Sequence, residues 1–156
     1  MRETTLCYIE KDEKYLMLHR VRKENDANHD KWIGIGGGFE PGETPEQCLL
    51  REVKEETGLS LTGYRYRAVI DFHSDEWEDE IMHLFTADAW TGEIADCDEG
   101  VLEWIHRDDL MALPHWEGDM IFLDLLRQDA PFFRLRLEYR GETLARAVLN
   151  GKEMKR

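Results

Sequence analysis

One helix with both ends specified by local residues constrains the fold of this chain more than any other feature. Thr44 is a good N-cap, Pro45 suits the first helical position, and Gln47 completes a capping box. Gly58 supplies the left-handed residue that ends many helices. The sequence therefore predicts a helix from residue 44 to residue 57.

The apolar side of this helix needs a surface to pack on. At about 100° per residue, one arc holds Leu49, Leu50, Val53 and Thr57, and we expect this arc to face a sheet. Around the helix, the chain alternates strand-like and short helical runs. Strands are expected at 4–10, 14–20, 64–74, 79–90, 100–106, 132–140 and 142–150, with a turn at Arg140–Gly141, a loop at 21–31 and helices at 107–113 and 117–128. This order predicts a single α/β or α+β layered domain over residues 1–156.

A second stripe of the same helix is acidic. Glu52, Glu55 and Glu56 are spaced i, i+3 and i+4, so their carboxylates lie along one side. They crowd the C-terminal half, where the helix dipole disfavours negative charge, and only Lys54 offers a local positive neighbour. A solvated acidic face is the plain interpretation. The alternative is a divalent cation, and oxygen-only ligands favour Mg²⁺ or Mn²⁺.

The segment before the helix is unusually rich in glycine. The run from Gly34 to Gly38 carries only one side chain, that of Ile35, so a ligand can approach the backbone closely. No Gly-Lys-Ser/Thr follows, which excludes a Walker loop. A glycine-rich strand leading into a Glu-lined helix suggests metal-bound phosphates beside the backbone.

Overall charge and composition exclude several classes of partner. The net charge is −14 and no Lys/Arg run interrupts it, which excludes polymeric nucleic acid. No apolar stretch is long enough for a signal peptide or a membrane span. The three cysteines are odd in number and form no C-x-x-C pair, as is typical of reduced thiols. We expect a soluble cytoplasmic protein, monomeric or homodimeric.

Taken together, these residues match the Nudix box, G-x5-E-x7-R-E-U-x-E-E-x-G-U with U aliphatic. The matched positions are Gly37, Glu43, Arg51, Glu52, Val53, Glu55, Glu56, Gly58 and Leu59. The chain thus resembles the Nudix hydrolases, which implies a mixed β-sheet between helices. The resemblance also implies Mg²⁺- or Mn²⁺-dependent hydrolysis of a nucleoside diphosphate linked to another group.

Roles in the box follow from the same resemblance. Glu52 and Glu56 would be direct metal ligands, and Glu55 a ligand or a water-mediated partner. The Gly36 carbonyl would join them. Glu43 and Arg51 would form a structural ion pair that closes the loop onto the helix.

Beyond the box, the chain resembles MutT-like members that act on oxidised purine nucleotides, in particular a MutX-type subgroup. The resemblance places Trp32 and Trp116 at a base pocket, Asp119 at the purine edge and Lys23 at the phosphates, while Glu99 assists the metal or the attacking water. The residues alone also fit plainer roles: core aromatics for the tryptophans, a helix-start acid for Asp119 and solvated positions for Glu99 and Lys23. Relatives often carry a lysine where this chain has Gly38, a base-contacting Asn where it has Ile33 and a second acid where it has Gly118.

These features predict an enzyme that hydrolyses 8-oxo-dGTP or a related nucleotide to the monophosphate and pyrophosphate. The general base stays open among Glu55, Glu56 and Glu99. An undamaged dNTP, a nucleotide sugar or a dinucleoside polyphosphate is the alternative substrate. A non-catalytic module that senses a nucleotide is the alternative of another class.

Overall fold

The computed structural model describes residues 1–21, 26–97 and 100–155. The strands and helices follow in chain order: β1 Arg2–Lys11, β2 Lys14–His19, β3 Trp32–Ile33, α1 Pro45–Thr57, β4 Ser60–Ser74, β5 Glu80–Thr91, β6 Val101–His106, the 3-10 helix η1 Arg107–Ala112, α2 Asp119–Arg127, β7 Phe133–Arg140, β8 Thr143–Leu149 and β9 Lys152–Glu153. The expected strands and helices are therefore present. The short strand β9 was not expected.

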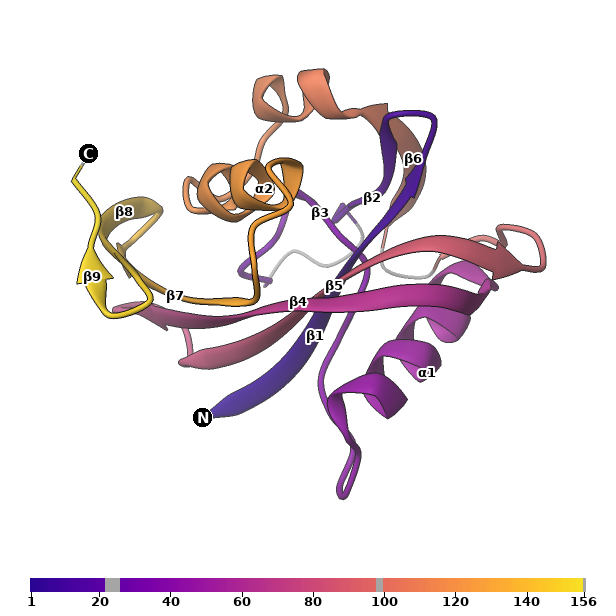
Figure 1. The fold of residues 1–156 in the computed structure, drawn as a ribbon, viewed down its shortest axis with the longest axis horizontal. Coiled ribbons are helices and arrows are strands. Elements are labelled where there is room, and N and C mark those ends of the chain that lie inside the picture. Colours follow the sequence, from indigo (N-terminus) through magenta and orange to yellow (C-terminus); the bar gives the residue numbers. More distant parts are fainter. Residues whose placement is uncertain (22–25, 98–99, 156) are drawn as a thin grey trace.

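The described strands form a mixed sheet in the order β3-β2-β1-β5-β4-β7-β8-β9, with β6 paired to β2. The pairs β1–β5 and β4–β7 are parallel, and the remaining pairs are antiparallel. Helix α1 lies on one side of the central strands and α2 lies on the other, which confirms the predicted sheet between helices (Figure 1).

Helix α1 has the predicted ends. The Thr44 side chain accepts a hydrogen bond from the Gln47 backbone N–H, the Gln47 side chain accepts one from the Thr44 backbone N–H, and Gly58 is left-handed at φ 82°. The predicted apolar arc was partly wrong, because Leu50 is 38% exposed. The residues that α1 buries are Cys48, Leu49, Val53, Glu56 and Thr57. The buried arc is thus rotated away from Leu50 and takes in a carboxylate.

Strand β1 separates two packing environments because its side chains alternate in direction. Cys7 and Ile9 pack in the core under α1, whereas Tyr8 packs in the core on the α2 side. The glycine-rich segment runs beside β1: Thr5 N–H donates to the Gly37 carbonyl at 3.0 Å and Cys7 N–H to the Ile35 carbonyl at 2.6 Å. The glycine run therefore lies beside β1, the strand whose side chains enter both cores.

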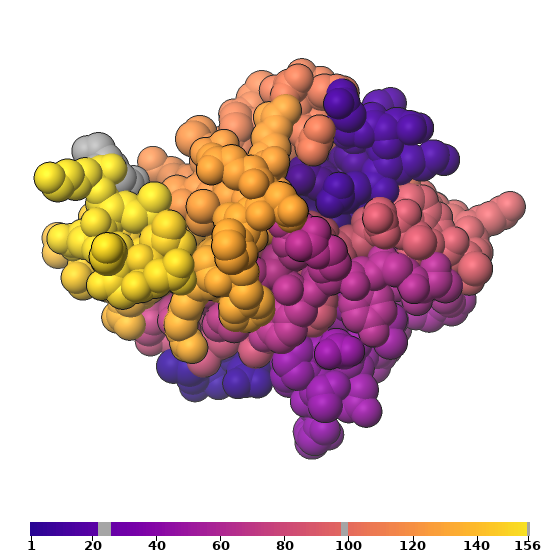
Figure 2. Space-filling view, in the orientation of Figure 1, coloured from indigo at the N-terminus to yellow at the C-terminus, as the bar shows by residue number. Residues whose placement is uncertain are grey.

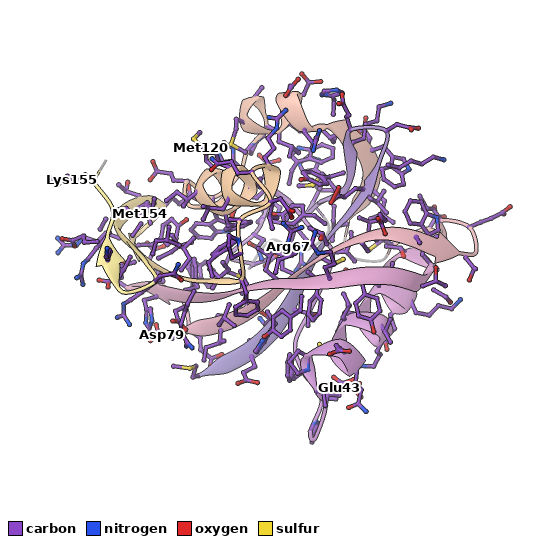
Figure 3. The ribbon with its side chains drawn as sticks, in the orientation of Figure 1. Glu43, Arg67, Asp79, Met120, Met154 and Lys155 are labelled. Atoms are coloured by element: carbon purple, nitrogen blue, oxygen red, sulfur yellow. The ribbon has the colours of Figure 1, made fainter. Side chains whose placement is uncertain are left out.

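Two further differences concern the C-terminal half. The β7–β8 hairpin turns at Gly141–Glu142, one residue later than expected, because Arg140 pairs with Thr143. In α2, Met120 is 52% exposed and points away from the sheet, while Phe122 and Leu126 are buried (Figure 3). In the ranges given above, no helix is both long enough and apolar enough to cross a membrane.

Candidate functional site

Arg51 ties the loop before α1 to the helix itself. Its Nε and Nη2 donate to the two carboxylate oxygens of Glu43 at 2.7 and 2.8 Å, and Nη2 also donates to the Gly38 carbonyl at 3.0 Å. These hydrogen bonds from Arg51 lower the pKa of Glu43 to about 2, and the Glu40 amide adds to the effect. The loop protrudes at the lower edge of the molecule, where Glu43 is labelled (Figures 2 and 3). The ion pair expected between Glu43 and Arg51 is therefore formed.

Arg51 also supplies positive charge to the acidic stripe, where the sequence indicated only Lys54 as a local positive neighbour. Its Nη1 donates to Glu52 at 2.9 Å and to Glu55 at 3.2 Å. Lys54 instead donates to the Gly58 carbonyl at the end of the helix, at 3.1 Å. Adjacent residues on a helix do not normally face each other, but the long arginine side chain reaches its neighbour Glu52.

Glu56 extends from the same helix toward the glycine run. It is only 8% exposed, and its Oε2 accepts a hydrogen bond from the Gly36 N–H at 3.2 Å. A Cβ at Gly36 would lie 1.8 Å from the Thr5 carbonyl oxygen, and one at Gly37 would lie 2.5 Å from the carboxyl carbon of Glu52. Gly36 is therefore required by its backbone contact, whereas a side chain at Gly37 would displace the Glu52 carboxylate. The carboxylates of Glu52 and Glu56 meet the backbone of the same loop.

The carboxylates of Glu52, Glu55 and Glu56 and the Gly36 carbonyl are suitable ligands for a hard divalent cation. Carboxylates and backbone carbonyls are the ligands that Mg²⁺ and Mn²⁺ prefer, and no sulfur or imidazole lies in the set. Among the residues with described positions, no three His, Cys, Asp or Glu already converge as a metal site. Arg51 holds Glu52 and Glu55, and the Gly36 amide holds Glu56. A cation at this position therefore competes with Arg51 and the Gly36 amide for the same carboxylate oxygens.

A cavity of about 370 Å³ begins at the glycine run and extends between the sheet and the segment before α2. Its lining includes Gly36 and Gly37 together with Trp116 and Asp119. Alternate residues of β1 contribute Thr4, Leu6 and Tyr8 to its wall, as the strand period requires. One cavity is thus lined by two of the residues expected at a base pocket and by the glycines that contact Glu52 and Glu56.

Trp116 and Asp119 are joined through the start of α2. The Trp116 N–H donates to Asp119 Oδ2 at 3.3 Å, and burial raises the pKa of Asp119 to about 7. The Lys31 ammonium lies 4.5 Å from the centroid of the indole ring. One face of Trp116 is therefore occupied by protein, so a flat ligand has at most the other face to stack on.

The remaining expected positions are distributed differently. Trp32 stacks on His19 with ring centroids 4.4 Å apart and is not among the residues that line the described cavity. A Cβ at Gly118 would lie 2.6 Å from both Leu137 and the Tyr139 hydroxyl, which leaves no room for a second acid. Lys23 and Glu99 lie outside the described residues.

The cavity residues that the sequence reasoning missed include Arg2, Arg20 and Asn28. Arg20 is paired with Asp26 at 2.9 Å, and Asn28 accepts a hydrogen bond from the Trp116 indole at 2.7 Å. No local motif marks them, because two lie in or beside a polar aperiodic loop and one near the chain start.

Several known proteins are similar in sequence to this chain. The NUDIX domain family matches residues 1–126. The "Uncharacterized Nudix hydrolase YvcI" of Bacillus subtilis (strain 168) is 31% identical over 134 residues, which cover 81% of this chain and 79% of that protein. The "Oxidized purine nucleoside triphosphate hydrolase" of Danio rerio is 35% identical over 111 residues, with 70% and 71% covered. The "NAD-capped RNA hydrolase NudC" of Salmonella paratyphi C is 34% identical over 110 residues, which span 68% of this chain but only 39% of that protein.

Solved structures agree on the architecture. The MutT mutator protein from Bacillus halodurans superimposes with a TM-score of 0.84, covering 96% of this chain and 98% of that one. The two sequences are 23% identical, so this likeness shows the shared fold alone.

Proposed function

Because this chain belongs to the NUDIX domain family and is a Nudix hydrolase, we propose that its substrate is an oxidised purine nucleoside triphosphate such as 8-oxo-dGTP. The products would be the nucleoside monophosphate and pyrophosphate. The observation that carries the proposal is the cavity of about 370 Å³, whose lining holds both Trp116 with Asp119 and the glycines Gly36 and Gly37 that contact the acidic helix. A nucleotide needs both groups of residues, one for its phosphates and one for its base.

The base end has the chemistry that a purine requires. Stacking on an aromatic side chain contributes about 1–3 kcal/mol per base, and Trp116 lines the cavity. The Asp119 carboxylate can accept hydrogen bonds from the N1–H and N2–H donors of a guanine edge. The Danio rerio relative, named for oxidised purine nucleoside triphosphates, lends support to this assignment.

The phosphate end combines acids, backbone and an arginine. Hydrolases of this family use a divalent metal, and we assign Mg²⁺ or Mn²⁺ to Glu52 and Glu56, with Glu55 and the Gly36 carbonyl as further ligands. When bound, such a cation neutralises phosphate charge and acidifies a coordinated water. Arg2, which lines the same cavity and is half-exposed, would attract the triphosphate into a chain whose net charge is −14.

A carboxylate must also accept the proton of the attacking water. Glu55, Glu56 and Glu99 are the candidates, and Glu99 lies outside the described residues. Glu55 is exposed and accepts a hydrogen bond from Arg51 at 3.2 Å, whereas Glu56 is buried against the Gly36 amide. The buried carboxylate suits a fixed ligand, and the exposed one is free to turn toward water.

A panel of nucleotides tests the proposal. Purified protein with Mg²⁺ is incubated separately with 8-oxo-dGTP, dGTP, a nucleotide sugar, a dinucleoside polyphosphate and NAD, and products are separated by chromatography. We expect the highest kcat/KM for 8-oxo-dGTP, with monophosphate and pyrophosphate in equal amounts. Glu56→Gln is the matched inactive control.

Other outcomes contradict the proposal in different ways. Faster hydrolysis of a nucleotide sugar or a dinucleoside polyphosphate would move the substrate class within the family. Release of orthophosphate would place the attack on another phosphorus. Tight binding without turnover would indicate a sensing module in place of an enzyme.

A further inference from the structure

Asn28 faces the cavity from the segment between β2 and β3, and its side chain is held by the indole of Trp116. The indole Nε1–H donates to Asn28 Oδ1 at 2.7 Å. Because an indole N–H can only donate, the Asn28 oxygen must be the atom that faces it. The orientation of the amide is therefore fixed by chemistry, and the Nδ2 group, with two N–H donors, is what Asn28 offers to a ligand.

The backbone around Asn28 is braced on both sides. Its N–H donates to Asp26 Oδ1 at 3.2 Å, and its carbonyl accepts from the Lys31 N–H at 2.9 Å. Asp26 is in turn paired with Arg20 at 2.9 Å, with both side chains largely buried. Since backbone and side chain are both anchored, the donor is positioned before any ligand arrives.

Trp116 places two complementary polar groups on one part of the cavity. Its indole N–H holds Asn28, and its backbone N–H holds the Asp119 carboxyl at 3.3 Å. Asn28 is left with donors, whereas an ionised Asp119 has only acceptors. A guanine-type edge presents the reverse pattern, one carbonyl acceptor at C6 beside the N1–H and N2–H donors.

We propose that Asn28 is a specificity-determining residue that donates a hydrogen bond to the C6 carbonyl of the purine and so selects 6-oxopurines over 6-aminopurines. The proposal rests on the proposed function, because it assigns the base end of the same cavity. Adenine-type bases carry an amino donor at C6, which would meet the Asn28 donors without an acceptor. A buried polar group left unpaired in this way discriminates strongly between otherwise similar ligands.

The substitution Asn28→Asp separates this role from a structural one. A carboxylate oxygen can still accept the Trp116 indole N–H, but the second oxygen replaces the two donors with an acceptor. Asn28→Ala removes both functions. Asn150→Asp is the matched control. Asn150 likewise uses its Oδ1 as a hydrogen-bond acceptor, here for the Arg134 backbone N–H at 2.9 Å, and it lies in the β8–β9 turn.

Dissociation constants for 8-oxo-dGMP and 8-oxo-dAMP are measured by calorimetry, so that the readout depends on the base and not on turnover. The ratio of the two constants cancels any uniform repulsion from the added charge. The wild type and Asn150→Asp should prefer 8-oxo-dGMP. In Asn28→Asp the ratio should shift at least about tenfold toward 8-oxo-dAMP, and in Asn28→Ala it should shift in the same direction by less, because Asp119 still accepts from the guanine edge.

An unchanged ratio in Asn28→Asp would overturn the proposal and leave Asn28 as a support for Trp116. Equal weakening of the binding of both monophosphates would overturn the C6 assignment. A wild type that binds both equally would overturn the proposed selection of 6-oxopurines. Failure of the wild type to hydrolyse 8-oxo-dGTP, with the shift in Asn28→Asp intact, would refute the proposed reaction but not the base selection. A wild type that binds neither monophosphate would refute both.

Discussion

A Cβ at Gly37 would lie 2.5 Å from the carboxyl carbon of Glu52, so the glycine is required by the position of that carboxylate. Gly37→Ala should therefore displace Glu52 while leaving the helix and sheet in place. We expect turnover to fall by about two decades, as when a preorganised charged group is removed, with a nearly unchanged melting temperature.

Gly38→Ala is the control for this substitution. Its Cβ would meet only the end of the flexible Arg2 side chain, at 3.3 Å. Steady-state kinetics of both variants with the preferred nucleotide check the prediction. Equal activity of Gly37→Ala and Gly38→Ala would show that Glu52 does not need its observed position.

The charge of Glu56 is expected to matter more than its hydrogen bond. Glu56→Gln keeps an oxygen that can accept the Gly36 N–H but removes the negative charge. Turnover should fall by about 2–3 decades, and the rise in melting temperature that Mg²⁺ gives the wild type should shrink. Calorimetry with and without EDTA measures the second effect, and Glu46→Gln on the exposed first turn of α1 is the control. Wild-type activity in Glu56→Gln would remove Glu56 from the metal site.

The pair of Glu43 and Arg51 should make stability depend on acid pH. The pKa of Glu43 is lowered from 4.5 to about 2, chiefly by hydrogen bonds from Arg51. A carboxylate with a depressed pKa stabilises the fold fully above its unfolded value, and that contribution is lost as pH falls from about 4.5 toward 2. The difference in melting temperature between wild type and Glu43→Gln should therefore shrink over this range.

Arg51→Ala should lose the same pH-dependent component and lower the melting temperature at pH 7 as well. It strands the Glu43 carboxylate and leaves the Gly38 carbonyl without its 3.0 Å donor. An Arg51→Ala variant with an unchanged melting temperature and no turnover would instead assign Arg51 to the chemistry.

Asp119 should give the opposite pH dependence. Burial raises its pKa from 3.8 to about 7, so the folded protein binds an extra proton between these values, and this contribution to stability falls as pH rises. Acceptance from guanine N1–H needs the ionised form, so kcat/KM for 8-oxo-dGTP should rise through about pH 7. Asp119→Asn should flatten both profiles; a pH profile identical to that of the wild type would exclude Asp119 from base binding.

The two tryptophans expected at the base pocket should behave differently. Trp116 lines the cavity, whereas Trp32 stacks on His19 and is not among the lining residues. Trp116→Phe should weaken purine preference, because the phenyl ring cannot hold the Asn28 oxygen. Trp32→Phe should preserve the preference, measured as the ratio of kcat/KM for 8-oxo-dGTP and 8-oxo-dATP; a loss equal to that of Trp116→Phe would bring Trp32 into the base site.

Local spacing was sufficient to predict the acidic helix and its loop. The caps at Thr44 and Gly58, the glycine run and the acids of the second stripe act over a few residues, so their physical meaning is visible in sequence. The order of strands and helices predicted an α/β or α+β layered domain, and the resemblance to the Nudix hydrolases supplied the mixed sheet between helices. These features needed no knowledge of distant contacts.

Tertiary structure decided which of these residues meet and which are excluded. Arg51 reached its neighbours Glu52 and Glu55 because its side chain is long, and Leu50 stayed exposed because the sheet receives a slightly rotated face of α1. Asn28 and Trp116 are 88 positions apart, yet one hydrogen bond fixes the orientation of an amide in the cavity. Such contacts depend on strand pairing and packing between distant segments, which the spacing of residues along the chain does not encode.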